Sequence, residues 1–308
     1  MASQRSEDVN NERPTRIAIA EYRDPEKPSP GIRSSISADG DDEFLVDELR
    51  RHRCVVTFHP WDCCNVRWED FDVIIIRKTW DYHLKYDAFL EWIQCLEQSG
   101  VKVVNPPQVL RWNTNKRYLE HLSKKGVAII NTIFVDKGQA PSLTSIMQKW
   151  PKIVLKPIIG LNGHQVTKIY NQENMTAKQE AFQLMLNDSQ DGVMVQPYMP
   201  GAQMELSIIF IAGLYSHAIR LQPGESENRD YRQPLRCHPH ADAMTVAECA
   251  IKACPWEHAP VYARVDLVED FEEGGYKLME MELVEPSLYL NVESAVRLAN
   301  VILKQPQS

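Results

Sequence analysis

The last third of the chain carries acidic side chains and one arginine at spacings that suit metal and phosphate binding. Residues 262–290 read YARVDLVEDFEEGGYKLMEMELVEPSLYL. Because residues two apart in a strand share a face, Arg264 and Asp266 point the same way. Glu280 and Glu282 share a face on the following run. If the two runs pair as a hairpin, three carboxylates repel one another unless a cation lies among them. Mg²⁺ takes oxygen ligands of this kind together with substrate phosphates.

An ordinary solvated hairpin would explain any one of these acids. An Arg-x-Asp facing a Glu-x-Glu between apolar residues favours a functional site, in which Arg264 holds a phosphoryl oxygen or stabilises developing charge.

Two lysines stand in contexts that are typical of phosphate binding. Lys156 interrupts an apolar strand in KIVLKPIIGLNGH, where its burial without an anion would be costly. Gly160 and Gly163 in the following loop allow backbone amides to approach a phosphate closely. Lys116 opens a predicted helix, where an anion is also favoured. Each lysine alone is more often a solvated surface residue, but together with the carboxylates they form a phosphate- and metal-binding constellation.

The elements that must position these groups follow two patterns. The first part of the chain alternates short apolar strands with amphipathic helices, which predicts a doubly wound α/β domain from strands at 16–22, 54–58, 72–76 and 101–104 and helices at 43–52 and 84–98. The later part mixes helices with strands and hairpins. Its helices are predicted at 113–125, 176–187 and 241–253, and its strands at 127–135, 152–158 and 193–199. Two hairpins are predicted, the first from 205–211 and 215–221 and the second from 261–268 and 276–284. The arginine-rich segment 222–240 is predicted to be a long loop of the kind that forms lids.

Composition and charge exclude several classes of protein. The 308 residues include 34 Lys and Arg against 42 Asp and Glu, and a net charge of −8 argues against non-specific nucleic-acid binding. No apolar run approaches ~18 residues, so we expect no membrane span. The seven cysteines include no CxxC pair, which disfavours a zinc site or a disulfide framework and indicates a cytoplasmic protein. Neither GxxxxGK[ST] nor GxGxxG occurs, so a nucleotide must be held in another way.

The order of these motifs resembles the ATP-grasp superfamily, and most of all the branch with the prokaryotic glutathione synthetase ATP-binding domain. The motifs are Lys116, Lys156-Pro with its glycine loop, the strand VMVQPYMPG, Glu205, Arg264-Val-Asp266 and Glu280-Met-Glu282. Further stretches at 77–82, 105–107, 111–119 and 285–288 resemble the cyclo-ligase subgroup that closes O-ureido-D-serine into D-cycloserine. The resemblance runs from about residue 16 to residue 300.

The resemblance implies an ATP-grasp fold with a doubly wound N-terminal α/β domain, a central lid domain and a C-terminal α+β domain. After a disordered tail at 1–14, these domains are predicted at 15–110, 111–200 and 201–308. The ATP-binding residues that the resemblance implies are Lys116, Lys156, Gly160, Gly163, Gln196, Tyr198 and Glu205. The implied ligands of Mg²⁺ or Mn²⁺ are Asp266, Glu280 and Glu282, the last of which is often Asn in the superfamily. The implied catalytic residues are Arg220 and Arg264, and the implied substrate-binding residues are Arg77, Trp80, Asp81, Tyr82, Arg232, Glu285 and Ser287.

The activity predicted from this resemblance is an ATP- and Mg²⁺-dependent ligation. A small amino-acid-like carboxylate is activated as an acyl phosphate and then forms an amide bond, by ring closure within one molecule or, alternatively, with a second molecule as in glutathione synthetase. A non-catalytic ATP-binding protein and a plain kinase are the remaining alternatives. The expected partner is a small-molecule carboxylate or amino acid, with neither nucleic acid nor membrane, and a homodimer is common among similar enzymes.

Overall fold

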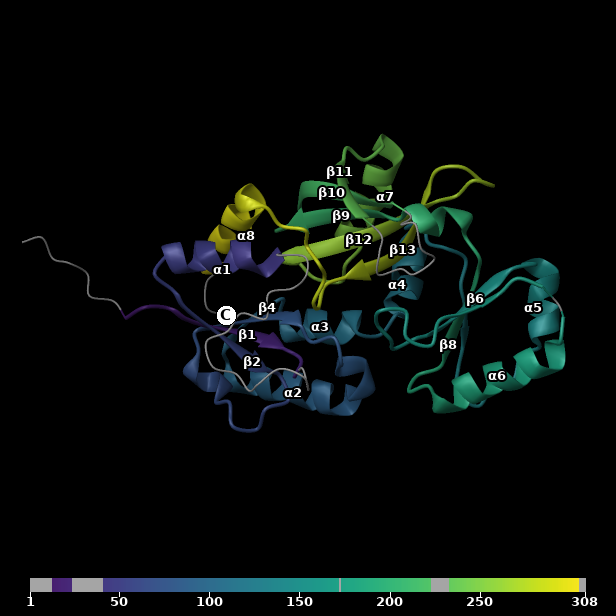
Figure 1. Cartoon of the computed structure of the whole chain (residues 1–308), viewed down its shortest axis with the longest axis horizontal. Helices are drawn as coiled ribbons and strands as arrows, with labels where there is room; N and C mark the ends of the chain where they lie inside the picture. Colours follow the sequence, from purple (N-terminus) through teal and green to yellow (C-terminus); the bar gives the residue numbers. More distant parts are fainter. Residues whose placement is uncertain (1–12, 24–40, 172, 223–232, 305–308) are drawn as a thin grey trace, which may run out of the picture.

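The chain folds into three β-sheets with helices packed between and around them (Figure 1). The computed structural model describes residues 13–23, 41–171, 173–222 and 233–304. The predicted tail at 1–14 therefore lies almost wholly outside the described residues, and so does Arg232. Within the described ranges, none of the helices combines the length and the apolar character needed to cross a bilayer.

The first sheet contains four parallel strands in the order β2-β1-β3-β4, as expected for a doubly wound domain. The strands are β1 (Arg16–Glu21), β2 (Val55–Pro60), β3 (Val73–Lys78) and β4 (Lys102–Val104). Helices α1 (Asp41–Arg51) and α2 (Tyr86–Ser99) connect them, and α2 ends at Gly100 with a left-handed φ of 69°. β3 is buried along its whole length, which explains why its sequence VIIIRK is almost continuously apolar.

The central sheet contains four antiparallel strands in the order β5-β8-β6-β7. The strands are β5 (Ile133–Val135), β6 (Ile153–Pro157), β7 (Thr167–Ile169) and β8 (Val193–Pro197). Helices α5 (Leu143–Lys149) and α6 (Met175–Asp188) pack against this sheet and bury Phe182 in a separate apolar core. Only 133–135 of the predicted strand 127–135 belongs to this sheet, because the backbone of Ala128 and Ile130 bonds to Leu278 of the neighbouring sheet instead.

The third sheet contains five antiparallel strands in the order β11-β10-β9-β12-β13. Both predicted hairpins are confirmed, as β9 (Leu206–Ile211) with β10 (Leu214–Gln222) and as β12 (Tyr262–Glu269) with β13 (Tyr276–Glu282). The edge strand β11 (Gln233–Cys237) occupies part of the segment 222–240 that was predicted to be a loop, and residues 223–232 lie outside the described part. Helix α7 (Ala241–Lys252) precedes β12, and α8 (Val292–Lys304) follows β13.

The predicted helix 113–125 is present only as α4 (Tyr118–Lys124), and a further short helix that was not predicted, α3 (Pro107–Asn113), precedes it. The later start has a physical cause, because the Lys116 amide donates to the Ile158 carbonyl directly after β6 and not to a helical carbonyl. Asn113 then fixes the end of α3 by bonding the backbone of Met281 and Leu283, at 2.7 Å in each case.

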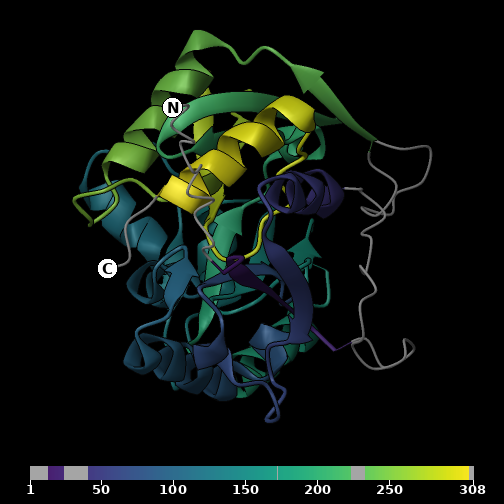
Figure 2. The ribbon, with the colours of Figure 1, turned by 90° about the vertical axis from the view of Figure 1, so that its left-hand side faces the viewer.

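Helix α8 lies against α1, as both views show (Figure 2). Leu298 and Ile302 of α8 share an apolar core with Ile17 of β1 and Leu45 of α1. The last helix of the described chain therefore completes the packing of the first sheet.

Candidate active site

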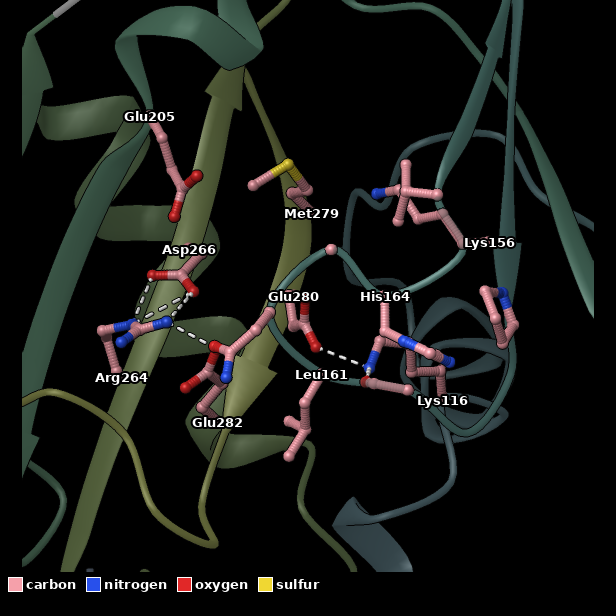
Figure 3. A pocket seen from close by; sticks show the side chains of 15 residues that line it. Lys116, Lys156, Leu161, His164, Glu205, Arg264, Asp266, Met279, Glu280 and Glu282 are labelled. Atoms are coloured by element: carbon pink, nitrogen blue, oxygen red, sulfur yellow. Dashed lines mark hydrogen bonds and ion pairs between the residues drawn. The ribbon is translucent and has the colours of Figure 1, made fainter. Parts of the chain in front are cut away.

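A pocket lies between the central sheet and the carboxyl-terminal sheet (Figure 3). Residues predicted from the sequence to bind phosphate or metal line it together: Lys116, Lys156, Gly160, Gly163, Glu205, Arg264, Asp266, Glu280 and Glu282. The lysines and the glycine loop approach from one side, and the arginine and the carboxylates project from β12 and β13 on the other.

The predicted Arg-x-Asp and Glu-x-Glu pairs do face each other across the hairpin. In the β12–β13 register Arg264 lies opposite Glu282, and Asp266 lies opposite Glu280. The Arg264 guanidinium donates to Asp266 through Nε at 2.9 Å and Nη2 at 3.0 Å, and to Glu282 through Nη2 at 2.5 Å. Ser207 on β9 donates to Asp266 at 2.6 Å. The hairpin therefore concentrates an arginine and three carboxylates on one face.

Burial makes the charges of this face interdependent. The Asp266 side chain is 2% exposed and that of Arg264 is 12% exposed. Burial raises the pKa of Glu282 to about 8, against the opposing effect of Arg264, and Asp266 and Glu280 add to the rise. Burial also acts to raise the pKa of Glu280, but Lys116 outweighs it and holds that pKa below its ordinary value. The carboxylates thus disfavour one another's charged forms, and a further cation would favour the charged forms.

A divalent cation fits the chemistry of this donor set, since three carboxylates share one face of the pocket. Within the described ranges, however, no three His, Cys, Asp or Glu side chains are grouped closely enough to surround an ion. Asp266 and Glu282 contact Arg264 instead, and Glu280 contacts Lys116. Basic side chains therefore provide the positive charge at this face.

Lys116 connects the acidic face to the glycine loop that follows β6. Its Nζ lies 2.8 Å from Glu280 Oε1 and donates to the Gly160 carbonyl at 2.6 Å. In the same loop Asn162 and Gly163 have left-handed φ angles of 51° and 71°. The loop therefore turns sharply while one lysine holds it against the carboxylates.

Three predicted nucleotide or catalytic residues do not line this pocket. The Gln196 side chain is 2% exposed and donates to Thr132 Oγ1 at 2.9 Å. The Tyr198 ring packs 5.1 Å from that of Tyr170. Arg220 Nη2 donates to the Tyr276 hydroxyl at 3.1 Å, on the same sheet as the acidic face.

The segment predicted to contact substrate follows the carboxyl end of β3. Arg77 is 3% exposed and its Nε lies 2.6 Å from Asp42. Asp81 accepts hydrogen bonds from Trp61 and Lys85, each at 2.7 Å. The partners of Arg77 and Asp81 within the fold hold this segment in place.

The two aromatic rings of this segment, Trp80 and Tyr82, differ in burial. Tyr82 is 3% exposed and stacks on Phe89 with 4.6 Å between centroids, so it belongs to the core. Trp80 is half-buried beside Tyr22, at 5.8 Å. Trp80 is thus the more accessible of the two.

Glu285 and Ser287 follow β13 in the chain. Glu285 is 6% exposed, and none of the residues that the structure describes donates a hydrogen bond to its carboxyl. Burial raises the pKa of Glu285 well above its ordinary value, and the Glu282 charge adds to this effect. The Ser287 carbonyl accepts from Arg264 Nη1 at 3.4 Å.

Sequence reasoning missed residues that hold or line the site. Asn105 donates to the carbonyls of Tyr262 and Leu283, at 2.9 Å each, and so ties the end of β4 to both strands of the acidic hairpin. His164 and Met279 line the pocket. The sequence marks Asn105 only as part of the stretch 105–107 that resembles the cyclo-ligase subgroup, without a role, and it offers no signal for Met279.

The two antiparallel sheets, with lysines and carboxylates between them, define an ATP-grasp enzyme. Two family models agree with this architecture. The D-cycloserine synthetase DcsG N-terminal domain matches residues 17–105, and the prokaryotic glutathione synthetase ATP-grasp domain matches residues 124–256. The chain therefore contains a domain of the DcsG N-terminal kind followed by an ATP-grasp domain of the glutathione synthetase kind, which is consistent with a carboxylate–amine ligase.

Known proteins similar to this chain include a cycloserine enzyme. The cycloserine biosynthesis protein DcsG of Streptomyces lavendulae is 27% identical over 290 residues, which covers 88% of this chain and 95% of that protein. The crystal structure of D-cycloserine synthetase DcsG has a TM-score of 0.79 at 24% identity and covers 93% of this chain and 98% of that chain. The crystal structure of D-alanine–D-alanine ligase from Bacillus anthracis complexed with ATP has a TM-score of 0.64 at 15% identity, over 94% of this chain and 96% of that chain. ATP-grasp enzymes use ATP and divalent metal ions.

Proposed function

We propose that this protein activates the carboxylate of a small amino-acid-like substrate with ATP and Mg²⁺ and closes it into a cyclic amide. The observation that carries this proposal is a phosphate- and metal-type pocket joined to a first domain of the DcsG kind. The similarity to the cycloserine biosynthesis protein DcsG over most of both chains supports ring closure as the form of the reaction.

The basic residues of the pocket are proposed to bind the phosphates, and the acidic residues to bind the metal ion. Lys116 and Lys156 hold the phosphates from the side of the glycine loop, while Asp266, Glu280 and Glu282 hold the metal ion. When bound, Mg²⁺ neutralises negative charge on the phosphates. Arg264, which lies beside the same carboxylates, stabilises the oxyanion of the substrate carbonyl, and Arg220 adds positive charge from β10.

The reaction balances without a side-chain nucleophile. A substrate carboxylate oxygen takes the γ-phosphoryl group as its bond to ADP breaks, which gives an acyl phosphate. A nitrogen of the same molecule then attacks the carbonyl carbon, inorganic phosphate leaves, and the nitrogen loses a proton. Exclusion of water protects the acyl phosphate from hydrolysis.

The substrate site is proposed to lie where the first sheet meets the acidic hairpin. The Tyr262 hydroxyl lies 2.8 Å from the Ile76 carbonyl and 2.9 Å from the Val284 carbonyl. Ile76 and Val284 directly precede Arg77 and Glu285 in the chain. A basic and an acidic residue therefore follow the two carbonyls that contact the Tyr262 hydroxyl. Arg77 favours a substrate carboxylate, and the buried Glu285 carboxyl favours a substrate amine. A zwitterionic amino acid meets both requirements.

Trapping with hydroxylamine tests the proposal, because hydroxylamine converts acyl phosphates to hydroxamates. We expect ATP-dependent hydroxamate formation from a single amino-acid carboxylate, together with ADP, and no hydroxamate when both Asp266→Asn and Glu280→Gln are present. Without hydroxylamine the expected products are ADP, inorganic phosphate and a cyclic amide.

Other outcomes identify the alternatives. ADP release only with pairs of amino acids would mean ligation between two molecules. A stable phosphorylated product would mean a kinase. ATP binding without turnover on any carboxylate, unchanged by the paired substitution, would mean a non-catalytic ATP-binding protein.

A further inference from the structure

Two histidines from different parts of the fold meet beside the pocket. His83 lies in the 3₁₀ helix η2 (Tyr82–Leu84), directly after the proposed substrate segment 80–82. His164 lies in the glycine loop between β6 and β7 and lines the pocket (Figure 3). Their ring centroids are 5.0 Å apart and the ring planes meet at 60°, an edge-to-face contact.

The contact favours a neutral His83 ring. Nδ1 of His83 is buried, and no described residue forms a hydrogen bond with it. Burial lowers the pKa of His83, and His164 and Lys116 act in the same direction, whereas Asp81 and a hydrogen bond with the Trp80 backbone oppose them. Edge-to-face aromatic contacts add stability beyond the apolar area that they bury. His83 therefore contacts the loop chiefly by packing.

The glycine loop is held from outside by Lys116, by packing of Leu161 against the main apolar core and by the ring of His83. Lys116 holds its start through the Gly160 carbonyl at 2.6 Å. Further along, the described backbone bonds are local turns, from the His164 amide to Leu161 at 2.8 Å and from the Val166 amide to Gly163 at 3.1 Å. The ring of His83 is thus the contact from the first domain that fixes the far end of the loop.

We propose that His83 is a positioning residue that couples the substrate segment to the phosphate-binding loop. The inference rests on the proposed function and adds to it. A carboxylate bound beside residues 80–82 fixes η2, η2 fixes His164, and the loop is then ordered against the triphosphate. Phosphoryl transfer is favoured only when the acceptor is in place, so that ATP is not hydrolysed without a product.

Removal of the His83 ring tests the coupling through two measurements. In His83→Ala we expect the affinity for a non-hydrolysable ATP analogue with Mg²⁺, measured by calorimetry, to fall about two- to tenfold, the range of a lost aromatic contact. We also expect fewer amide products per ADP released. His83→Phe keeps an edge-to-face ring and should restore most of both quantities.

His121 provides a matched control. It is also a histidine with a buried, unbonded ring nitrogen (Nε2) among the described residues. It lies on α4, contacts Trp112 edge-on at 6.0 Å and does not line the pocket. His121→Ala should leave nucleotide affinity and the product-to-ADP ratio unchanged, whatever its effect on stability.

Two results would overturn the inference. The first is wild-type nucleotide affinity together with a wild-type product-to-ADP ratio in His83→Ala. The second is full additivity of His83→Ala and His164→Ala in nucleotide affinity, because residues that act through a direct contact are non-additive. If no carboxylate supports turnover in the wild type, the proposed function fails, whereas the nucleotide titration still tests the role of His83.

Discussion

Replacement of Arg264 by methionine tests whether the carboxylates around it form a cation site. The guanidinium is 12% exposed and contacts Asp266 at 2.9 Å and Glu282 at 2.5 Å. Methionine retains much of the apolar volume and removes the charge. Two carboxylates then remain in a largely buried face without their basic partner.

The size of the effect follows from two energies. Removal of one member of a buried ion pair costs about 3–5 kcal/mol of folding free energy. A ligand that binds only the folded state raises the free energy of unfolding by about 2.7 kcal/mol when its concentration is one hundred times its dissociation constant. We therefore expect Arg264→Met to lose about 3–5 kcal/mol in the presence of a chelator, and saturating Mg²⁺ to restore much of this loss. The wild type should gain less from Mg²⁺, because the ion must compete with Arg264.

Urea unfolding at a series of Mg²⁺ concentrations measures both energies. Arg77→Met is the matched control, since Arg77 also lies in a buried pair, 2.6 Å from Asp42. Only one carboxylate is left there, and Lys78 still lies 3.0 Å from it. The control should lose stability without a response to Mg²⁺. Equal responses of the two variants, or no response in Arg264→Met, would refute the idea that the acidic face binds a divalent cation.

Three further predictions concern other parts of the molecule. Burial lowers the pKa of His217 from 6.5 to about 4, so the unfolded chain binds the proton first as pH falls. About 3 kcal/mol of unfolding free energy should therefore be lost between pH 6.5 and pH 4. His217→Gln should lack this pH dependence of the unfolding free energy, and an unchanged pH dependence would assign it to other groups. Gly192→Ala should cost about 2–4 kcal/mol in urea unfolding, because φ is +107° and the new Cβ would lie 2.2 Å from the Val135 carbonyl oxygen. Gly100→Ala meets no atom within 4 Å and should cost clearly less, so equal costs would contradict this explanation. Glu285→Gln should raise the KM for an amine-bearing substrate about tenfold or more, as measured by ADP release, with little change for the analogue that lacks the amine; equal rises for both would exclude amine recognition.

The acidic hairpin was predictable because its signals are local. Alternation in Arg264-Val-Asp266 and in Glu280-Met-Glu282 indicates which of these side chains share a face, and the turn between the two runs predicts that they pair. Lys156 could be located by the same logic, since one charge in an apolar strand marks a site. The lysines and carboxylates accordingly meet in one pocket.

The remaining parts depend on contacts between distant segments, which periodicity does not encode. Nothing in the sequence pairs the Lys116 amide with the Ile158 carbonyl, so the later start of α4 was missed. The contact between His83 and His164 spans 81 positions of the chain for the same reason. The partner of Arg77 was missed as well, because Asp42 lies in the first turn of α1, 35 positions earlier in the chain.

The place of α8 has a consequence for synthesis of the chain on the ribosome. Residues 105–291 separate the end of β4 from the start of α8, which at ~5–20 residues per second takes on the order of 10–40 s to translate. During that interval the apolar face formed by Ile17 and Leu45 lacks its final cover, Leu298 and Ile302. The domain that is synthesised first is thus the last to have its apolar core covered. A nascent chain needs protection from aggregation at the face of Ile17 and Leu45 until α8 has emerged from the ribosome.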